Sequence, residues 1–249
     1  MSSKRTLDVA VSATGLIVLS PVLLVLALLV WLQDYHSPFY IAARVGRDGK
    51  PYKMVKFRSM IVRADKSGVD STASNDPRIT GLGKFIRRLK LDELPQLWNV
   101  LKGEMALVGP RPNVKRDTDI YTAQEKQLLS IAPGITDFAS IVFSDEGEIL
   151  AGSADPDLRY NQVIRPWKSR LGLLYVRNHG SVLLDLRLIQ LTILNSINRP
   201  AALAKLSEIL QSCGADRNLV EVALRRSQLQ AAPPPGANSI VTSREHTSV

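Results

Sequence analysis

The stretch SATGLIVLSPVLLVLALLVWLQD, residues 12–34, decides how the fold is laid out. It forms most of an apolar run from Val9 to Leu32 that contains no charged residue. About 20 such residues are enough to span a bilayer as a helix. Ser20 and Pro21 lie almost at the centre, where proline removes a helical hydrogen bond and clashes with the preceding turn. The stretch therefore predicts a membrane segment that is kinked or broken at its midpoint.

Two geometries are open for this segment. One straight helix of roughly 24 residues reaches about 36 Å and spans the membrane, whereas two arms of roughly 12 residues reach about 18 Å each and do not. Lys4 and Arg5 precede the run, and six Lys or Arg residues follow it between residues 44 and 58. Positive charge marks the cytoplasmic side, so the two flanks favour a re-entrant hairpin over a straight span. Since the run is long for a signal peptide and no A-x-A cleavage site follows, we expect it to be retained.

The net charge of +9 in 249 residues is concentrated beside this segment. Residues 44–116 contain 17 Lys or Arg and 7 Asp or Glu, a net of +10 that accounts for the whole excess. Such a block suits anionic lipid head groups or phosphorylated ligands. Aromatic residues are few and no nucleic-acid-binding motif is present, so we expect no nucleic-acid partner. The single cysteine, Cys213, excludes an internal disulfide.

The remaining patterns predict an α+β, mostly helical protein. Asp48 and Gly49, between two short β-prone stretches, predict a short β-hairpin. Residues 63–78 have the composition of a loop. Helical apolar spacing recurs in residues 81–105, 121–132, 166–178, 181–197 and 200–230. The very apolar 181–197 segment fits either the protein core or an interfacial amphipathic helix at the membrane surface.

These patterns divide the chain into four parts. We expect a membrane anchor over residues 1–36, a small cytosolic catalytic domain over 37–198 and a helical extension over 199–231. The extension is expected to contain two short helices split near Gly214. Residues 232–249 have the composition of a disordered tail.

The adjacent carboxylates Asp92 and Glu93 are the first candidate site. On spacing alone, Asp92 is best interpreted as the N-cap of a helix with Pro95 in its first turn. The same position also suits chemistry, because a helix dipole and the cations Arg87 and Arg88 upstream are expected to lower the pKa of Asp92 and keep it ionised. An ionised carboxylate can hold a divalent metal or attack a phosphorus atom.

A second candidate is the GPRP stretch, Gly109 to Pro112. Pro110 and Pro112 stiffen the backbone on both sides of Arg111, and a rigid guanidinium suits a phosphate or nucleotide. By itself the stretch is better read as an ordinary turn with an exposed arginine. In the same way, Lys56 and Arg58 of KFRSM would ordinarily form a solvated strand face.

Taken together, these motifs resemble one family. The central Ser-Pro of an apolar N-terminal segment, KFRSM (56–60), LDELPQLWNVLKGEMALVGPRP (91–112) and PGIT (133–136) are similar to the monotopic phosphoglycosyl transferases, also called bacterial sugar transferases. The resemblance covers roughly residues 4–198. It implies a re-entrant anchor on the cytoplasmic face of a bacterial inner membrane. It also implies transfer of a sugar phosphate from a UDP-sugar to a polyprenyl phosphate such as undecaprenyl phosphate, with release of UMP.

The resemblance also assigns roles to residues. It implies that Asp92 is the nucleophile, that Glu93 completes a catalytic dyad and that Mg²⁺ binds to Asp92 and Glu93. Lys56, Arg58, Arg87 and Arg88, with Pro110, Arg111 and Pro112 of GPRP, are expected to bind phosphates and nucleotide. Ser20 and Pro21 are expected to form the membrane kink. Membrane lipids and a second copy of the chain are further expected partners.

The sequence departs from the family after PGIT. Many members continue with Gly-Trp and later Asn-Gly-Arg, whereas PGITDFASIVFSDEGEIL (133–150) has no arginine and four acidic residues. No binding residue is therefore assigned in this stretch, and the sugar is not predicted. Without the extra N-terminal spans of larger relatives, the chain resembles a minimal catalytic form. The alternative hypothesis is a non-catalytic, membrane-anchored basic adaptor of a polysaccharide assembly complex.

Overall fold

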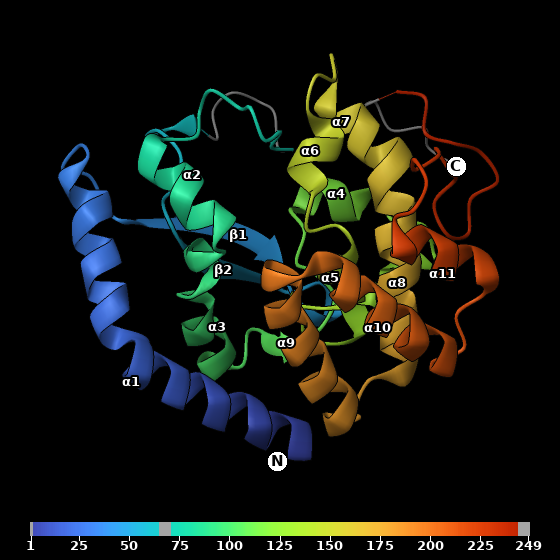
Figure 1. The fold of residues 1–249 in the computed structure, drawn as a ribbon, viewed down its shortest axis with the longest axis horizontal. Helices are drawn as coiled ribbons and strands as arrows, with labels where there is room; N and C mark the ends of the chain where they lie inside the picture. The colour runs from blue at the N-terminus through green and yellow to red at the C-terminus, as the bar shows by residue number, and fades with distance from the viewer. Residues whose placement is uncertain (1, 65–70, 244–249) are drawn as a thin grey trace.

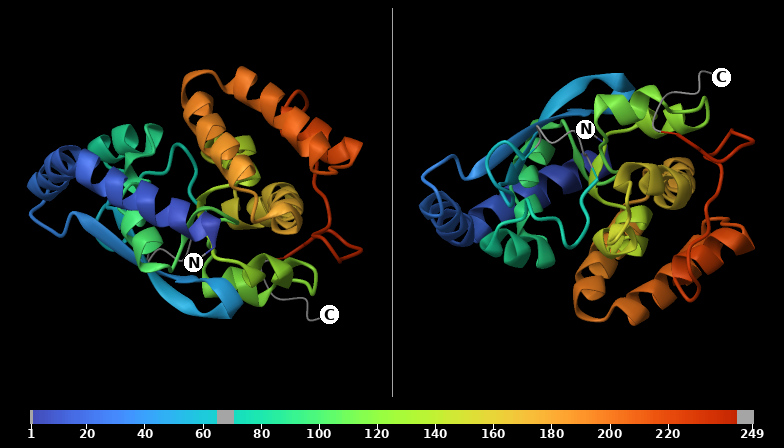
Figure 2. Two further views of the ribbon diagram at one scale, coloured as in Figure 1. Left: turned by 90° about the horizontal axis from the view of Figure 1, so that it is seen from below. Right: turned by 90° about the horizontal axis from the view of Figure 1, so that it is seen from above.

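The computed structural model describes residues 2–64 and 71–243, which form a mostly helical α+β fold with small sheets (Figure 1). The helical elements are α1 (Ser3–Leu32), η1 (Arg47–Gly49), α2 (Gly81–Arg88), η3 (Leu91–Glu93), α3 (Gln96–Lys102), α4 (Lys115–Asp119), η4 (Glu125–Ser130), α5 (Phe138–Val142), α6 (Glu146–Leu150), α7 (Pro156–Arg159), η5 (Tyr160–Ile164), α8 (Arg165–Asn178), α9 (Val182–Ile197), α10 (Arg199–Ser212) and α11 (Arg217–Leu224). The strands are β1 (Phe39–Val45), β2 (Pro51–Phe57), β3 (Ala106–Val108) and β4 (Gly134–Thr136). Figure 2 shows α1 and the β1–β2 hairpin towards one end of the molecule and α10 and α11 at the other.

Helix α1 is one continuous helix that contains Pro21 and bends near its middle (Figure 1). Pro21 has no N–H to offer the carbonyl of Ile17, and the Ser20 hydroxyl donates to that oxygen at 2.8 Å. The structure thus has a bend where the sequence predicted a kink or a break. By length and composition α1 is able to cross a membrane, and only 11% of its most apolar window is buried.

The first turns of α1 are fixed to the rest of the protein by polar contacts. The Lys4 ammonium donates to Asp185 at 2.5 Å and to the Val108 carbonyl at 2.9 Å. Arg5 donates to the Val100 and Leu101 carbonyls, at 2.5 and 2.8 Å, where α3 ends. Lys4 and Arg5, which the sequence analysis counted only as a charged flank, therefore dock the helix onto the domain.

The C-terminal end of α1 is fixed as well. Leu26 and Val30 are buried in a cluster with Phe57 of β2 and Ile86 of α2. Just beyond the helix, both terminal nitrogens of Arg58 pair with Asp34, at 2.5 and 2.6 Å. Both ends of the helix thus contact the domain that carries β2, α2 and α3.

The predicted hairpin is present. Strands β1 and β2 are antiparallel, with Ala42 opposite Met54, and Asp48 and Gly49 have φ of 58° and 74° in the connection. The short strands β3 and β4 are parallel and pack closely. A Cβ on Gly134 would lie 2.1 Å from the Gly109 nitrogen, so only glycine permits this approach.

Helix α9 has features of both structures considered for residues 181–197, a core helix and an amphipathic helix with an exposed apolar face. Leu184, Leu188 and Leu191 are buried in the main core, whereas Ile193 and Ile197 are 61% and 81% exposed. The helix therefore closes the core with one face and presents apolar side chains to the surroundings with another.

The extension contains the two predicted helices, α10 and α11, separated near Gly214. Residues 232–243 had been predicted to be part of a disordered tail, but they lie against α8 and its surroundings. The Ala232 N–H donates to Gln162 at 3.0 Å, and Arg170 of α8 donates to the Pro233 carbonyl at 2.9 Å. Composition alone could not show that backbone groups of a proline-rich segment find partners on the domain. Residues 244–249, and residues 65–70 of the predicted loop, lie outside the described residues.

Candidate active site

Asp92 and Glu93 lie in η3, a single 3₁₀ turn between α2 and α3. Between α2 and this turn, Lys90 adopts a left-handed conformation with φ of 54°, which changes the direction of the chain. Helix α3 starts later, at Gln96, without a side-chain cap, so the prediction of Asp92 as its N-cap is wrong. Asp92 is buried, and its carboxylate accepts no hydrogen bond within residues 2–64 and 71–243.

Glu93 joins two cations from distant parts of the chain. Its Oε1 accepts hydrogen bonds from Lys56 Nζ of β2 at 3.2 Å and from an Arg111 terminal nitrogen at 2.5 Å. Both cations use the same oxygen, and Oε2 has no donor among the described residues. The fold thus brings together Lys56, Glu93 and Arg111, which are separated by up to 55 residues in sequence.

The loop that carries Arg111 is held from both sides. The Gly109 N–H donates to the Thr136 carbonyl at 3.0 Å, and the Gly134 N–H donates to the Pro110 carbonyl at 3.0 Å. Pro110 is buried and Pro112 is half-buried. These contacts and the two fixed φ angles direct the Arg111 side chain towards Glu93.

The pKa of Asp92 is raised, first by burial and second by the negative charge of Glu93. Lys56, Arg87 and Arg111 oppose this rise without cancelling it. The expected lowering of this pKa is therefore wrong. Asp92 lies in a one-turn 3₁₀ element and not at the start of an α-helix, so a helix dipole does not compensate for burial.

The neighbouring carboxyl behaves in the opposite way. Burial alone would raise the pKa of Glu93, but Arg111 and Lys56 together hold it well below its usual range. Burial lowers the pKa of the Lys56 ammonium, although Glu93 opposes that change. Glu93 is thus the anion that holds the cations, whereas Asp92 accepts no hydrogen bond from any residue that the structure describes.

The other predicted phosphate ligands divide into two groups. Arg87 is half-buried, and its charge acts on Asp92, so it lies near the dyad. Arg88 is exposed and has no polar partner in the part of the chain that the structure describes. The Arg58 guanidinium pairs with Asp34 just beyond the end of α1, so the structure gives it a partner outside the dyad, and its role in phosphate binding stays a prediction.

The two carboxylates fit Mg²⁺ only as part of a shared site. No group of three or more His, Cys, Asp or Glu side chains is close enough to hold a metal within the described ranges. However, Asp92 and Glu93 Oε2 are unused oxygens on adjacent residues. Mg²⁺ is commonly held by one or two carboxylates together with substrate phosphates, so this donor set is suitable when a phosphorylated substrate completes it.

Sequence reasoning missed a second ion pair beside this group. Glu146 of α6 accepts a short hydrogen bond from Lys168 of α8, and the Lys168 Nζ lies 5.3 Å from the centre of the Tyr160 ring. The charge of Glu146 adds to that of Glu93 in raising the pKa of Arg111. Helix α8 approaches the Arg111 loop, where a Cβ on Gly172 would lie 3.9 Å from the Pro110 Cβ. No local pattern indicates this pairing, because 21 residues separate Glu146 from Lys168.

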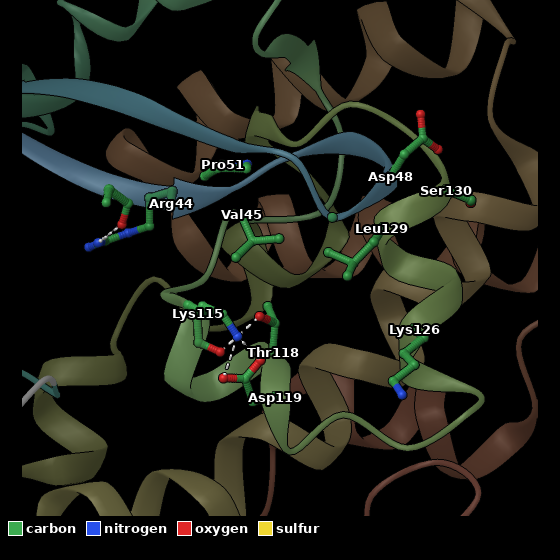
Figure 3. Close-up of a pocket in the computed structure, with 12 residues that line it drawn as sticks. Arg44, Val45, Asp48, Pro51, Lys115, Thr118, Asp119, Lys126, Leu129 and Ser130 are labelled. Atoms are coloured by element: carbon green, nitrogen blue, oxygen red, sulfur yellow. Dashed lines mark hydrogen bonds and ion pairs between the residues drawn. The ribbon is translucent and has the colours of Figure 1, made fainter.

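A cavity of about 610 Å³ lies between the tip of the β1–β2 hairpin, α4 and η4 (Figure 3). Its lining includes Arg44, Val45, Lys126 and Leu129, and Figure 3 shows Lys115 paired with Asp119 at its edge. None of Lys56, Asp92, Glu93 and Arg111 lines it. The candidate active site is therefore the charged group around the dyad and not this cavity.

Comparison with known proteins gives a family match over residues 1–199, to a family described as bacterial sugar transferase. The UDP-glucose:undecaprenyl-phosphate glucose-1-phosphate transferase of Klebsiella pneumoniae is 37% identical over 209 residues, which cover 81% of this chain and 42% of that protein. The UDP-galactose-lipid carrier transferase of Erwinia amylovora is 40% identical over 148 residues, covering 53% and 31%. The exopolysaccharide production protein ExoY of Sinorhizobium fredii is 38% identical over 149 residues, covering 54% and 66%. The chain thus spans less than two thirds of the length of each of these relatives.

Proposed function

The chain belongs to the bacterial sugar transferase family, and from this premise we propose that it is a phosphoglycosyl transferase. In this proposal it transfers a sugar-1-phosphate from a UDP-sugar to a polyprenyl phosphate, such as undecaprenyl phosphate, and releases UMP. The product, a polyprenyl-diphosphate-sugar, would begin the assembly of a surface polysaccharide or other glycan. The observation that carries the proposal is the buried residue Asp92, whose carboxylate has no hydrogen-bond donor among the described residues, beside a glutamate that holds two cations.

In the first step, a carboxylate oxygen of Asp92 attacks the phosphorus that bears the sugar. The bond between this phosphorus and the bridging oxygen of UMP breaks, and UMP leaves with the electron pair. The sugar phosphate is then joined to Asp92 as an acyl phosphate. A carboxylate that accepts no hydrogen bond needs no rearrangement of protein contacts before it attacks.

In the second step, a phosphate oxygen of the polyprenyl phosphate attacks the same phosphorus. The bond to the Asp92 oxygen breaks, which restores the carboxylate and gives the diphosphate product. Two anionic substrates thereby use one site in turn. The described cations around Asp92 oppose the negative charge that both steps bring together, and Arg111 and Lys56 are already placed by Glu93.

Mg²⁺, when bound through Asp92 and Glu93, would neutralise phosphate charge in both steps. The protein's own part is to keep oxygens available for it. Glu93 uses one carboxylate oxygen for both cations, and its other oxygen has no donor in the described ranges.

The membrane anchor in this proposal is re-entrant, with the active site on the cytoplasmic face of a bacterial inner membrane. The contacts at both ends of α1 support this geometry, because Lys4 binds Asp185 and Arg58 binds Asp34 within one domain. Contacts from both ends of the helix to one domain are consistent with both ends lying on the same side of the membrane. The exposed apolar side chains of α9, such as Ile193 and Ile197, suit the membrane surface beside it.

The activity is tested by UMP release from a panel of UDP-sugars with Mg²⁺ and undecaprenyl phosphate in detergent micelles. We expect turnover with at least one sugar, and an Asp92→Asn variant that neither turns over nor forms a phosphosugar adduct detectable by mass spectrometry. Lack of turnover across the panel would instead favour the non-catalytic adaptor. Normal activity of the variant would remove Asp92 from its assigned role.

The anchor is tested by labelling cysteines at two natural serines, Ser3→Cys and Ser37→Cys, in a Cys213→Ser background. Both positions should react with an impermeant maleimide from the cytoplasmic side of membrane vesicles. Reaction of the two positions from opposite sides would rule out the re-entrant geometry.

A further inference from the structure

The ion pair between Glu146 and Lys168 borders the proposed active site but has no part in the mechanism above. Lys168 is 13% exposed and Glu146 is 31% exposed, so solvent reaches both partners. Lys168 lies on the first turns of α8, directly after the π-helical turn η5 (Tyr160–Ile164), a feature that often marks functional positions. The pair is thus accessible to a ligand in the site.

Helix α8 brings Lys168 beside the loop that carries Arg111, because a Cβ on Gly172, one turn after Lys168 on the same face, would lie 3.9 Å from the Pro110 Cβ. Burial is the main cause of the lowered pKa of Lys90, and the charges of Arg111 and Lys168 add to it. Lys168 also acts on buried Asp137, in the segment that follows β4. Hydrogen bonds join Lys56 and Arg111 to Glu93, and Lys168 to Glu146, so each carboxylate in this region holds a cation.

The two carboxylates, Glu93 and Glu146, differ in how firmly they are held. Glu93 is held by two cations, with a side chain 13% exposed, whereas Glu146 has a direct hydrogen bond only from Lys168 among the described residues and is more exposed. Because the Glu146 side chain is 31% exposed, water can solvate its carboxylate when another anion takes its place on Lys168. Within the described residues, the Lys168 ammonium donates one hydrogen bond, to Glu146, and an ammonium has three N–H donors.

We propose that Lys168 is a further phosphate-binding residue of the nucleotide-sugar site, and that Glu146 holds it in place until a substrate phosphate replaces the carboxylate. The proposal rests on the proposed function and extends it by one residue. It supplies a cation opposite the 133–150 segment, which contains no Lys or Arg. The Tyr160 ring, with its centre 5.3 Å from the Lys168 nitrogen, gives the ammonium a further favourable contact at this position.

The test compares Lys168→Gln, Lys168→Arg and Glu146→Gln with the wild type, with Lys205→Gln as the control. Lys205 is an exposed lysine of α10 with no polar partner among the described residues. Initial rates of UMP release are measured against the concentration of UDP-sugar. Binding of UDP-sugar is measured by calorimetry in the Asp92→Asn background, which separates binding from turnover.

We expect Lys168→Gln to raise KM and the dissociation constant about 10- to 100-fold, with a much smaller change in kcat, because a charge-assisted hydrogen bond to phosphate is lost. Lys168→Arg should restore most of the affinity, and Glu146→Gln should leave it unchanged or improve it. The control should match the wild type.

An unchanged dissociation constant in folded Lys168→Gln overturns the proposal. If that variant does not fold, a loss of affinity in Glu146→Gln of tenfold or more overturns it, because the glutamate would then bind substrate or support the site. If the wild type turns over no UDP-sugar, the proposed function itself has failed, and binding to the Asp92→Asn protein still decides whether Lys168 contacts a nucleotide.

Discussion

Replacing Lys4 with methionine tests whether α1 is docked onto the catalytic domain. Asp185 is 2% exposed and accepts hydrogen bonds from Lys4 at 2.5 Å and from the Tyr175 hydroxyl at 2.6 Å. Methionine keeps the length of the side chain but leaves the buried Asp185 charge with only Tyr175. Breaking a buried ion pair by removing one partner costs about 3–5 kcal/mol. For a chain of this size, each kcal/mol lowers Tm by about 2–4 °C, so we expect a loss of about 6–20 °C.

The assay is thermal unfolding in detergent micelles, followed by circular dichroism, with Lys115→Met as the matched control. Lys115 pairs with Asp119 at 2.6 Å, but these side chains are 80% and 49% exposed, and such pairs are worth about 0–1 kcal/mol. The control should therefore change Tm by less than about 4 °C. If Lys4→Met falls within the range of the control, the N-terminal turns of α1 are not held by Asp185, and one of the two supports for the re-entrant geometry is lost.

Three further predictions concern the site and the core. Burial and Glu93 raise the pKa of Asp92, so the acid limb of the pH profile of kcat/KM should lie above the ordinary aspartate pKa of about 4. Lys56→Gln removes a cation that opposes this rise, and it should move the limb to still higher pH. A group whose pKa is higher in the folded state contributes stability at low pH, and this contribution is lost as pH rises through the folded-state pKa. Asp92→Asn, which we expect to be inactive, should therefore match or exceed the wild-type Tm at pH 7, with a gain that shrinks towards pH 4. A clear loss of Tm at pH 7 would contradict this. Leu206→Ala, in the buried face of α10, should lower the free energy of unfolding by about 2–5 kcal/mol in urea titrations. The control Leu183→Ala, at a position 60% exposed, should change it little. Equal effects of the two substitutions would mean that the extension is not part of the core.

The sequence predicted what depends on neighbours along the chain. Asp48 and Gly49 indicate a hairpin because both take positive φ at low cost, and Gly103 ends α3 for the same reason. The separation of α10 from α11 near Gly214 follows the same rule. Local patterns also selected Asp92 and Glu93 as candidates, but not their environment. The N-cap prediction failed because Leu91–Glu93 form a separate 3₁₀ turn before α3 starts.

Contacts across long stretches of sequence were beyond such reasoning. Lys4 meets Asp185 across 181 residues, and this pairing converts a charged flank into a docking contact. Lys56 lies near the end of β2 and Arg58 directly follows that strand, yet Lys56 contacts Glu93 and Arg58 contacts Asp34. The two residues have different partners because α1 packs against β2, and this packing cannot be predicted from residue spacing.

The two adjacent carboxylates, Asp92 and Glu93, have different environments, and Glu93 is needed to hold the cations of the site together. Three cations, Lys56, Arg87 and Arg111, act on Asp92, and without a fixed anion they would repel one another. Glu93 holds two of them through a single oxygen and remains ionised, because they lower its pKa more than burial raises it. Asp92 is then free of that task. In the proposed mechanism, a nucleophilic carboxylate bound by the same cations would have to lose those bonds before it could attack. Dividing the two roles between neighbouring residues would keep Asp92 reactive while its surroundings stay positive.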